Sequence, residues 1–117
     1  MHDNHIRTAR LIRVIDGDTI VVDIKLGFDV FLKSQTIRLV GINAPERRGQ
    51  TREKGNQAKK FLTDLLGQNR LSVRCNDWSK GTFGRWLCDV YVHNPAGGSL
   101  YVNGTMVNKG HALWDRR

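Results

Sequence analysis

The sequence predicts a small, mainly β domain of the α+β class, a closed β-barrel that carries helices. About five or six apolar, β-branched segments recur, with turn signals roughly every 8–12 residues between them. Residues 58–66 have the periodicity of an amphipathic helix instead. The chain has 117 residues, which is enough for one core and too few for two. We therefore expect a single domain over residues 1–117, with its core at about residues 8–114.

The first two strands are expected at residues 10–14 and 19–24, where apolar residues dominate. Asp16, Gly17 and Asp18 lie between them and form a turn signal, so a hairpin is the simplest arrangement. The two aspartates then either shape the turn or provide a carboxylate site at its tip. Residues 25–34 carry apolar side chains on alternate positions, which suits a third region of strand after a turn at Gly27.

Residues 36–46 contain the most informative stretch of the chain. Residues 36–42 are apolar or β-branched on both faces, which predicts a buried strand that Pro45 ends. Arg38 lies inside this run and Glu46 lies just after the turn. A guanidinium in such a strand is costly unless an anion meets it. Arg38 therefore pairs with Glu46 structurally, points off a sheet edge, or belongs to an anion-binding site.

A basic segment connects this strand to the predicted helix. Residues 47–60 contain one acid, Glu53, and six basic side chains: Arg47, Arg48, Arg52, Lys54, Lys59 and Lys60. Gly49 and Gly55 predict a mobile loop in its first half. The apolar positions of the helix recur at intervals of three and four residues: Ala58, Phe61, Leu62, Leu65 and Leu66. We expect Asn56 as its N-cap and Gly67 as its C-terminal stop.

The C-terminal half predicts two more strands, at residues 71–75 and 86–92. The polar segment between them ends in Arg85. A turn at residues 94–98 precedes a short strand at 100–102 and a short second helix, which Asn103 caps and Gly110 ends. Residues 111–114 close the fold. Cys75 and Cys88 fall in predicted strands without a CxxC motif, so we expect buried thiols.

The charge balance indicates the class of partner. There are 19 Lys and Arg residues against 11 Asp and Glu, a net charge of +8, which favours a polyanion and nucleic acid before membrane. No apolar run approaches the roughly 18 residues of a membrane span. The polar start predicts no signal peptide, which leaves a secreted chain with a trimmed leader and a cytoplasmic chain both open. The four histidines share no zinc-ligand spacing.

Five unusual residues together suggest phosphodiester hydrolysis. Arg38 and Arg85 offer planar donor forks that suit phosphate oxygens, and Glu46 can take a proton from water. Asp18 and the amide oxygen of Asn43 are hard ligands that suit Ca²⁺ rather than zinc or copper. A metal and two arginines stabilise the highly negative phosphorane while the base delivers hydroxide.

The order and spacing of three motifs resemble the signature of the staphylococcal nuclease family. The motifs are residues 14–19, 38–46 and 83–85, and the likeness continues through Val102, Asn103 and Val107 to residues 110–112. It covers residues 10–114, nearly the whole chain. The resemblance implies a five-stranded OB-type barrel with one main helix and a short second helix. It also implies calcium-dependent cleavage of DNA and RNA phosphodiesters, leaving 3′-phosphates.

The resemblance also implies roles for individual residues of this sequence. Asp18, Asn43 and the backbone carbonyl of Ala44 become calcium ligands. Arg38 and Arg85 bind the scissile phosphate, and Glu46 is the candidate general base. The nucleic-acid-binding residues are expected to be Arg47, Arg48, Arg52, Lys54 and Phe83. We expect a monomer that prefers single-stranded DNA or RNA, because an OB-type groove accepts unstacked strands most easily.

Three departures from the family pattern bear on these expectations. Asn43 replaces the usual second aspartate, so calcium should bind more weakly. Phe83 stands where a tyrosine is common, which removes a hydroxyl from the phosphate site. The family's last helix and its base-stacking aromatics would follow Arg117, so either Trp114 or Phe83 supplies a platform or substrate binds more loosely.

Two other functions remain open. If the chain is not a nuclease, it is either a catalytically weakened nucleic-acid-binding barrel or a protein-interaction domain. Asn43 favours these alternatives, because it removes a charge from the metal site. The joint presence of Arg38, Glu46 and Arg85 argues against them, because a binding module has no need of a base beside two phosphate forks.

Overall fold

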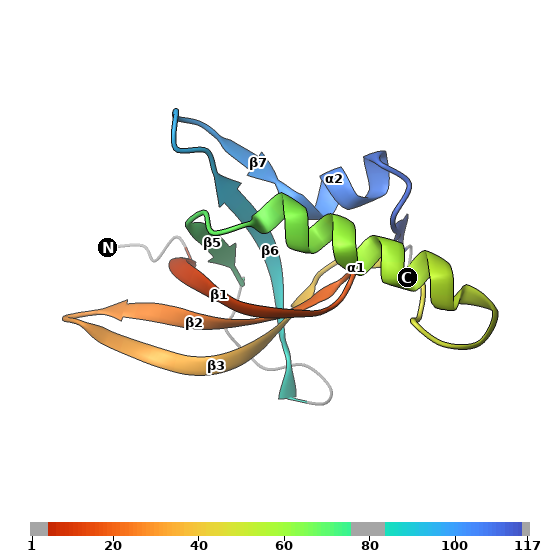
Figure 1. Cartoon of the computed structure of the whole chain (residues 1–117). Coiled ribbons are helices and arrows are strands. Elements are labelled where there is room, and N and C mark those ends of the chain that lie inside the picture. The colour runs from red at the N-terminus through yellow and green to blue at the C-terminus, as the bar shows by residue number, and fades with distance from the viewer. Residues whose placement is uncertain (1–4, 76–83, 116–117) are drawn as a thin grey trace.

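The computed structural model describes residues 5–75 and 84–115, and a closed five-stranded barrel forms its centre (Figure 1). The barrel strands are β1 (Ile6–Asp16), β2 (Thr19–Gly27), β3 (Val30–Leu39), β5 (Leu71–Arg74) and β6 (Trp86–His93). They are hydrogen-bonded in the order β3-β2-β1-β5-β6, and the parallel pairing of β3 with β6 closes the barrel. The other neighbours are antiparallel. The OB-type α+β fold expected from the sequence is confirmed.

The predicted first hairpin is present, and its turn is tight. Asp16 pairs with Thr19, so Gly17 and Asp18 form the turn between β1 and β2. Gly17 is buried there, because a Cβ on it would lie 2.7 Å from the Cβ of Ala58 and 2.9 Å from that of Ala44. Glycine therefore allows the turn to pack directly against the main helix.

The next two predicted strand regions form a single strand. Residues 25–27 extend β2, Phe28 and Asp29 form the turn with positive φ angles of 53° and 61°, and β3 then runs without a break from Val30 to Leu39. The expected turn at Gly27 is therefore displaced by one residue. Figure 1 shows this hairpin extending away from the rest of the molecule.

A buried carboxylate holds the irregular part of this hairpin. The Asp23 side chain accepts hydrogen bonds from the backbone N–H of Ser34 at 2.9 Å and from Arg10 Nη2 at 2.9 Å, and it lies 3.3 Å from Lys33 Nζ. Ser34 has a positive φ of 54° where the β2–β3 register shifts. These three donors, with the Ser34 N–H contributing most, lower the pKa of Asp23 to about 2.

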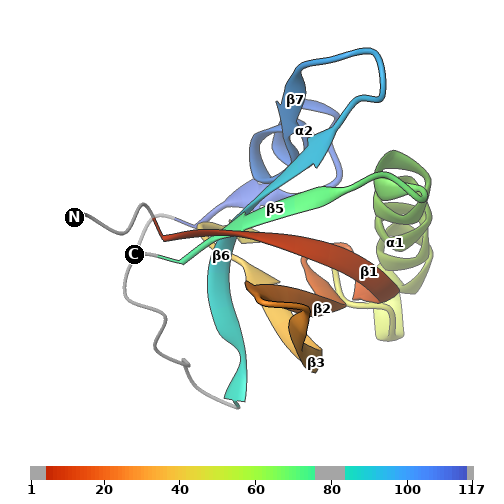
Figure 2. The same cartoon turned by 90° about the vertical axis from the view of Figure 1, so that its left-hand side faces the viewer.

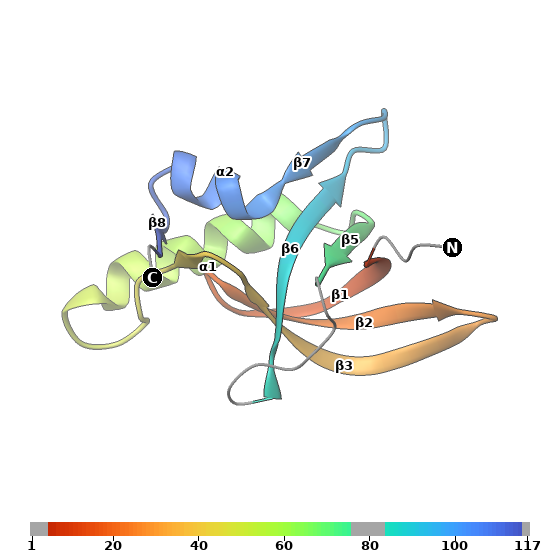
Figure 3. The same ribbon diagram turned by 180° about the vertical axis from the view of Figure 1, so that it is seen from behind.

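The strand expected over residues 36–42 ends earlier than predicted. β3 ends at Leu39, the chain turns at Val40 and Gly41, and β4 (Ile42–Asn43) pairs with β8 (Leu113–Trp114) outside the barrel sheet (Figure 3). Gly41 has a positive φ of 82°, and the Val40 N–H donates to the Cys88 carbonyl at 2.9 Å. The break therefore comes from a glycine turn bonded to β6, upstream of Pro45.

The main helix begins earlier than predicted. α1 (Arg52–Leu66) follows a single 3₁₀ turn, η1 (Gly49–Thr51), so the mobile loop and the Asn56 cap are both wrong and Thr51 is the N-cap. Gly55 lies within α1 and packs against the backbone of Glu46, whose carbonyl oxygen would be 2.5 Å from an added Cβ. This packing outweighs the low helix propensity of glycine. The predicted stop is confirmed at Gly67, which has a φ of 53°.

The short second helix is present, but Asn103 does not cap it. α2 (Val102–Asn108) follows β7 (Ser99–Tyr101), which pairs with β6, and Tyr101 is the N-cap. Asn103 is fully buried: its amide donates to the Val40 carbonyl at 3.0 Å, and its Oδ1 accepts from the Val90 N–H at 2.9 Å. The side chain therefore ties α2 to β6 and to the turn after β3.

The core lies between the barrel and the two helices. Its fully buried members include Ile20, Ile37, Leu39, Leu62, Leu71, Val90 and Met106. Figure 2 shows α1 and α2 beside the barrel, with β5 between β1 and β6. Cys75 and Cys88 are buried thiols, as predicted. Within residues 5–75 and 84–115, no helix is long and apolar enough to cross a membrane.

Candidate active site

Arg38 is held on the outer face of the barrel by its own strand. Its neighbours Ile37 and Leu39 are fully buried, so alternation along β3 directs the Arg38 side chain outward. Nη1 donates to the Leu39 carbonyl at 2.9 Å, and Nη2 donates to Asn43 Oδ1 at 2.6 Å. The same Nη2 lies 3.4 Å from Asp18 Oδ2. Arg38 therefore pairs with Asp18 and does not form the structural pair with Glu46 that the sequence left open.

The turn between β1 and β2 brings Asp18 to this guanidinium. Asp18 Oδ1 accepts a hydrogen bond from the Thr19 hydroxyl at 2.9 Å, and Oδ2 accepts one from the backbone N–H of Ala44 at 2.9 Å. Both the Asp18 and Arg38 side chains are largely buried, at 13% and 17% exposure. Four of the predicted site residues thus form one hydrogen-bonded cluster: Asp18, Arg38, Asn43 and Ala44.

A cavity of about 290 Å³ joins Arg85 to this cluster. In the parallel pairing of β3 with β6, Ile37 lies opposite Trp86, so Arg85 enters the sheet close to Arg38. The walls of the cavity are Arg38, Leu39, Val40, Gly41, Ile42, Asn43, Arg85, Leu87 and Asp115. Two arginines therefore line one small hollow, an arrangement that suits a phosphate group.

Asp115 is a wall of this cavity that sequence reasoning missed. Its backbone N–H donates to the Gly41 carbonyl at 2.8 Å, which continues the pairing of Asn43 with Leu113. Alternation then puts the side chains of Asp115 and Asn43 on the same face. Only the β4–β8 pairing reveals this, since Asp115 reads as part of a polar end in the sequence.

Glu46 lies apart from the cavity walls. Its side chain is 71% exposed, and Oε2 accepts a hydrogen bond from Arg48 Nε at 3.3 Å. Its backbone is fixed more firmly, because Thr51 Oγ1 donates to the Glu46 carbonyl at 2.8 Å and Gly55 packs against it. The backbone of Glu46 is thus held in place while its carboxylate is accessible to water.

The predicted nucleic-acid-binding residues divide into two groups. Arg47 and Arg48 have acidic partners, because Arg47 Nε lies 2.8 Å from Asp16 Oδ1 and Arg48 is bonded to Glu46. Arg52 and Lys54 are exposed on the first turn of α1. Phe83 lies outside the described residues. Trp114, the other candidate for base stacking, is 49% exposed on β8.

The oxygen atoms of Asp18 and Asn43 converge on a single cationic nitrogen, Arg38 Nη2, at 3.4 and 2.6 Å. Both oxygens therefore lie within reach of the same guanidinium nitrogen. Carboxylate and amide oxygens suit a hard ion such as calcium. Asp18 brings the one formal negative charge of the pair. Among the described residues, no group of three or more His, Cys, Asp or Glu is arranged to hold a metal. The chemistry of these two donors suits a hard cation, and only one of them carries charge.

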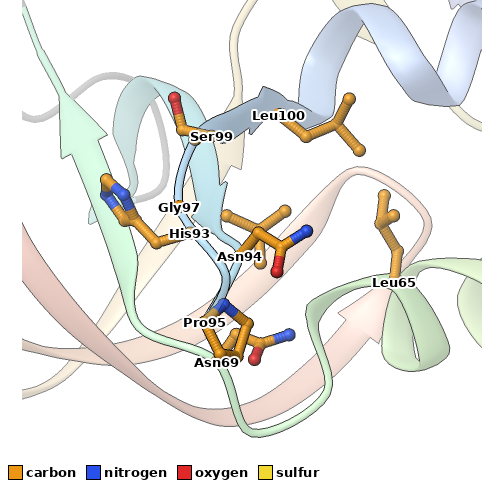
Figure 4. Close-up of a pocket in the computed structure, with 10 residues that line it drawn as sticks. Leu65, Asn69, His93, Asn94, Pro95, Gly97, Ser99 and Leu100 are labelled. Carbon is orange, nitrogen blue, oxygen red and sulfur yellow. The ribbon is translucent and has the colours of Figure 1, made fainter.

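A separate cavity of about 510 Å³ lies near the C-terminal end of α1 (Figure 4). Its walls come from the end of α1, the β6–β7 turn and β7, and they include Leu65, Asn69, His93, Asn94, Pro95, Ser99 and Leu100. Among the residues that the structure describes, none of the predicted site residues lines it, and neither does any arginine, lysine, aspartate or glutamate. This cavity therefore lacks the charged side chains that line the one with Arg38 and Arg85.

The chain is similar to a known protein family and to individual relatives. The family described as Staphylococcal nuclease homologue matches residues 36–116. A thermonuclease of Staphylococcus hyicus is 33% identical over 89 residues, covering 74% of this chain and 49% of that protein. An uncharacterized endonuclease of Escherichia coli O157:H7 is 34% identical over 107 residues, covering 91% of this chain and 59% of that protein. The chain thus spans about half to three-fifths of the length of these relatives.

Proposed function

The chain belongs to the staphylococcal nuclease family, and from this premise we propose that it is a nuclease that hydrolyses phosphodiester bonds in DNA or RNA. The products would carry 3′-phosphates, as the resemblance of its motifs implies. The observation that carries the proposal is the shared cavity of Arg38 and Arg85, about 290 Å³ in volume. Cleavage is proposed to take place where these guanidiniums meet.

The two arginines bind the non-bridging oxygens of the scissile phosphate. The Leu39 carbonyl accepts from Arg38 Nη1, which fixes the plane of the guanidinium before substrate arrives. A guanidinium that is already held in position stabilises the phosphorane, because its hydrogen-bond donors do not have to reorient during the reaction. Arg85 binds from the other side, on the segment that leads into β6.

Glu46 acts as the general base that takes a proton from the attacking water. To do so, its carboxylate must give up the hydrogen bond from Arg48 Nε and accept one from that water. The side chain is 71% exposed, so water can reach it. The packing of Gly55 against the Glu46 backbone fixes the position of this residue, while its carboxylate stays accessible to solvent water.

Asp18, Asn43 and the backbone carbonyl of Ala44 would hold a calcium ion. Bound calcium supplies positive charge that stabilises the phosphorane. The support for this part of the proposal is the convergence of the Asp18 and Asn43 oxygens on one cation. Magnesium should substitute poorly, because it demands a tighter octahedron of ligands.

The substrate is proposed to be a single strand that binds to a monomer. An OB-type barrel accepts unstacked strands most easily, and the exposed Arg52 and Lys54 add positive charge on α1. Trp114 offers an exposed ring for stacking a base. Arg47 and Arg48 contribute less, because Asp16 and Glu46 already pair with them.

The test is cleavage of single-stranded DNA and RNA oligonucleotides with calcium, with a chelator, and after calcium is restored. Asp18→Asn should abolish calcium-dependent cleavage, whereas Asp16→Asn should retain it. Both substitutions remove one aspartate charge from the same turn, but only Asp18 contacts the cluster around Arg38. Full cleavage in chelator with magnesium, or equal loss in the two variants, would contradict the metal assignment.

A nucleic-acid-binding module is the second candidate function. Asn43 favours it, since the site holds one formal charge fewer than the family pattern provides. The same assay separates the two functions, because a binding module retains the labelled oligonucleotide in a mobility-shift gel and leaves its length unchanged. Shortened products with 3′-phosphate ends support the nuclease.

A further inference from the structure

The register of β5 and β6 places the two cysteines opposite each other. The strands pair from Leu71 with Val92 to Arg74 with Asp89, and the next pair in that register is Cys75 with Cys88. The His93 N–H donates to the Arg70 carbonyl at 2.9 Å, which identifies Arg70 and His93 as a hydrogen-bonded pair. Hydrogen-bonded and non-hydrogen-bonded pairs alternate along an antiparallel ladder, so Cys75 and Cys88 form a non-hydrogen-bonded pair. The Cα atoms of such a pair lie about 4.5 Å apart.

Both thiols also point to the same side of the sheet. Directly opposite residues share a face, and Cys75 and Cys88 are 3% and 0% exposed, which places both side chains in the core. Burial and the neighbouring Cys75 thiol raise the pKa of Cys88 well above its usual range. The two sulfur atoms are thus close neighbours, although no disulfide joins them here.

We propose that Cys75 and Cys88 are a disulfide site, and that the bond forms when the chain folds in the presence of a small-molecule disulfide such as oxidised glutathione. The Cα separation of such a strand pair falls within the range of about 4.4–6.8 Å that disulfides require. One cysteine thiolate attacks the small disulfide and releases one small thiol. The second cysteine then attacks the mixed disulfide and releases the other, so one S–S bond forms and one is consumed.

The folded protein should oxidise slowly. The thiolate is the attacking species, and the raised pKa of Cys88 together with the burial of both sulfurs keeps it scarce and inaccessible. Unfolded chain exposes both thiols. Oxidation should therefore be much faster during refolding than in the native state, which makes the bond a structural cross-link acquired on folding.

The cross-link would stabilise the strand that leads from the candidate active site. The Cys88 carbonyl accepts hydrogen bonds from the Val40 N–H at 2.9 Å and the Asn103 amide at 3.2 Å, so β6 is tied at this point to the turn beside the cavity. A disulfide restricts the unfolded chain between residues 75 and 88. We expect oxidation to raise the midpoint of thermal unfolding by roughly 5–15 °C.

The test compares protein refolded with reduced glutathione alone against protein refolded with a mixture of reduced and oxidised glutathione. Each sample is alkylated in denaturant and weighed by mass spectrometry. The expected result is two alkyl groups on the first sample and none on the second, with a linked Cys75–Cys88 peptide after proteolysis. Thermal melts of both samples should show the increase in midpoint.

The single variants Cys75→Ala and Cys88→Ala and the double variant are the controls. Their melting temperatures should not rise after refolding with oxidised glutathione, whatever small decrease in stability the removal of a sulfur causes. The proposal is overturned if wild-type chain refolded with oxidised glutathione still takes two alkyl groups. It is equally overturned if the product is a glutathione adduct or a linked dimer, or if the internal disulfide lowers the melting temperature.

Discussion

Arg38 Nη2 donates a 2.6 Å hydrogen bond to the amide oxygen of Asn43. The same nitrogen lies 3.4 Å from Asp18 Oδ2, so the guanidinium occupies the point where the two expected calcium ligands meet. A neutral amide accepts the hydrogen bond without adding charge to this point. The residue at position 43 therefore sets how much negative charge is available to a cation here.

Asn43→Asp should tighten calcium binding, because the number of charged ligands is a main control on calcium affinity. Calorimetric titration of calcium into both proteins measures the change, and the calcium dependence of cleavage should shift to lower concentration in parallel. Melting temperatures should be similar at saturating calcium. Without calcium, repulsion from Asp18 destabilises the variant, although Arg38 lies between the two carboxylates and offsets part of it. An unchanged calcium affinity would show that Asn43 is not a ligand.

Arg38→Lys and Arg85→Lys should each reduce turnover by about 10²-fold or more. Lysine keeps the charge but loses the planar fork, and Arg38 uses that fork to hold the Leu39 carbonyl and Asn43 at once. Single-turnover rates with a short oligonucleotide measure the reduction. Arg13→Lys, on an exposed part of β1, is the matched control and should retain the wild-type rate. Normal rates for either cavity variant would exclude that arginine from the chemistry.

The barrel strands and the main helix could be predicted because their signals are local. The Asp16–Asp18 turn, the apolar alternation of β5 and β6, and the spacing of Ala58, Leu62 and Leu66 are each visible in a short window. The site residues Arg38 and Glu46 stood out for a related reason, since charge in or beside an apolar run is locally anomalous. These signals can be recognised without knowing which distant segment packs against each element.

Several features that sequence reasoning missed depend on contacts between distant parts of the chain. Gly55 is helical because the Glu46 backbone lies against it, and Asn103 is buried because Val40 and Val90 supply its hydrogen-bond partners. Asp115 reaches the cavity only through pairing with the segment at Gly41. A glycine or an asparagine carries no mark in the sequence that distinguishes a turn or a cap from such a packed position.

Replacing Arg52 and Lys54 together with glutamine should weaken substrate binding and flatten its salt dependence. Both are exposed on α1, and each phosphate that the protein no longer neutralises should reduce the slope of log affinity against log salt by about 0.7 for a single strand. Fluorescence anisotropy over a series of salt concentrations measures this slope. Replacing Arg47 and Arg48 should have a smaller effect, because each already has an acidic partner. Equal slopes in wild type and the Arg52/Lys54 variant would mean that these charges do not touch the strand.

Asp23 should contribute to stability in a defined window of acid pH. Its pKa is lowered from 3.8 to about 2 in the folded protein, so the folded state favours the carboxylate. The resulting stabilisation is complete above about pH 3.8 and is lost as the pH falls towards 2. Thermal melts from pH 2 to 6 should show this decline in wild type and a flatter profile in Asp23→Asn. Asp29→Asn, on the exposed turn of the same hairpin, should keep the wild-type profile. Parallel profiles for wild type and Asp23→Asn would refute this role.

Gly55→Ala should destabilise the protein and displace Glu46, against the usual effect of this substitution. In an exposed helix the change stabilises by about 1 kcal/mol, because alanine has the higher helix propensity. Here the new Cβ would lie 2.5 Å from the Glu46 carbonyl oxygen and 2.8 Å from the Arg47 nitrogen, both rigid backbone atoms. Overpacking of this kind costs about 1–3 kcal/mol, so denaturant melts should show a net decrease in stability. Turnover should fall while oligonucleotide affinity changes little, as for Glu46→Gln, if Glu46 is the base. Gln57→Ala, on the exposed side of the same helix, should alter neither quantity appreciably. A Gly55→Ala protein that is more stable and fully active would show that the close approach of α1 to Glu46 is not needed.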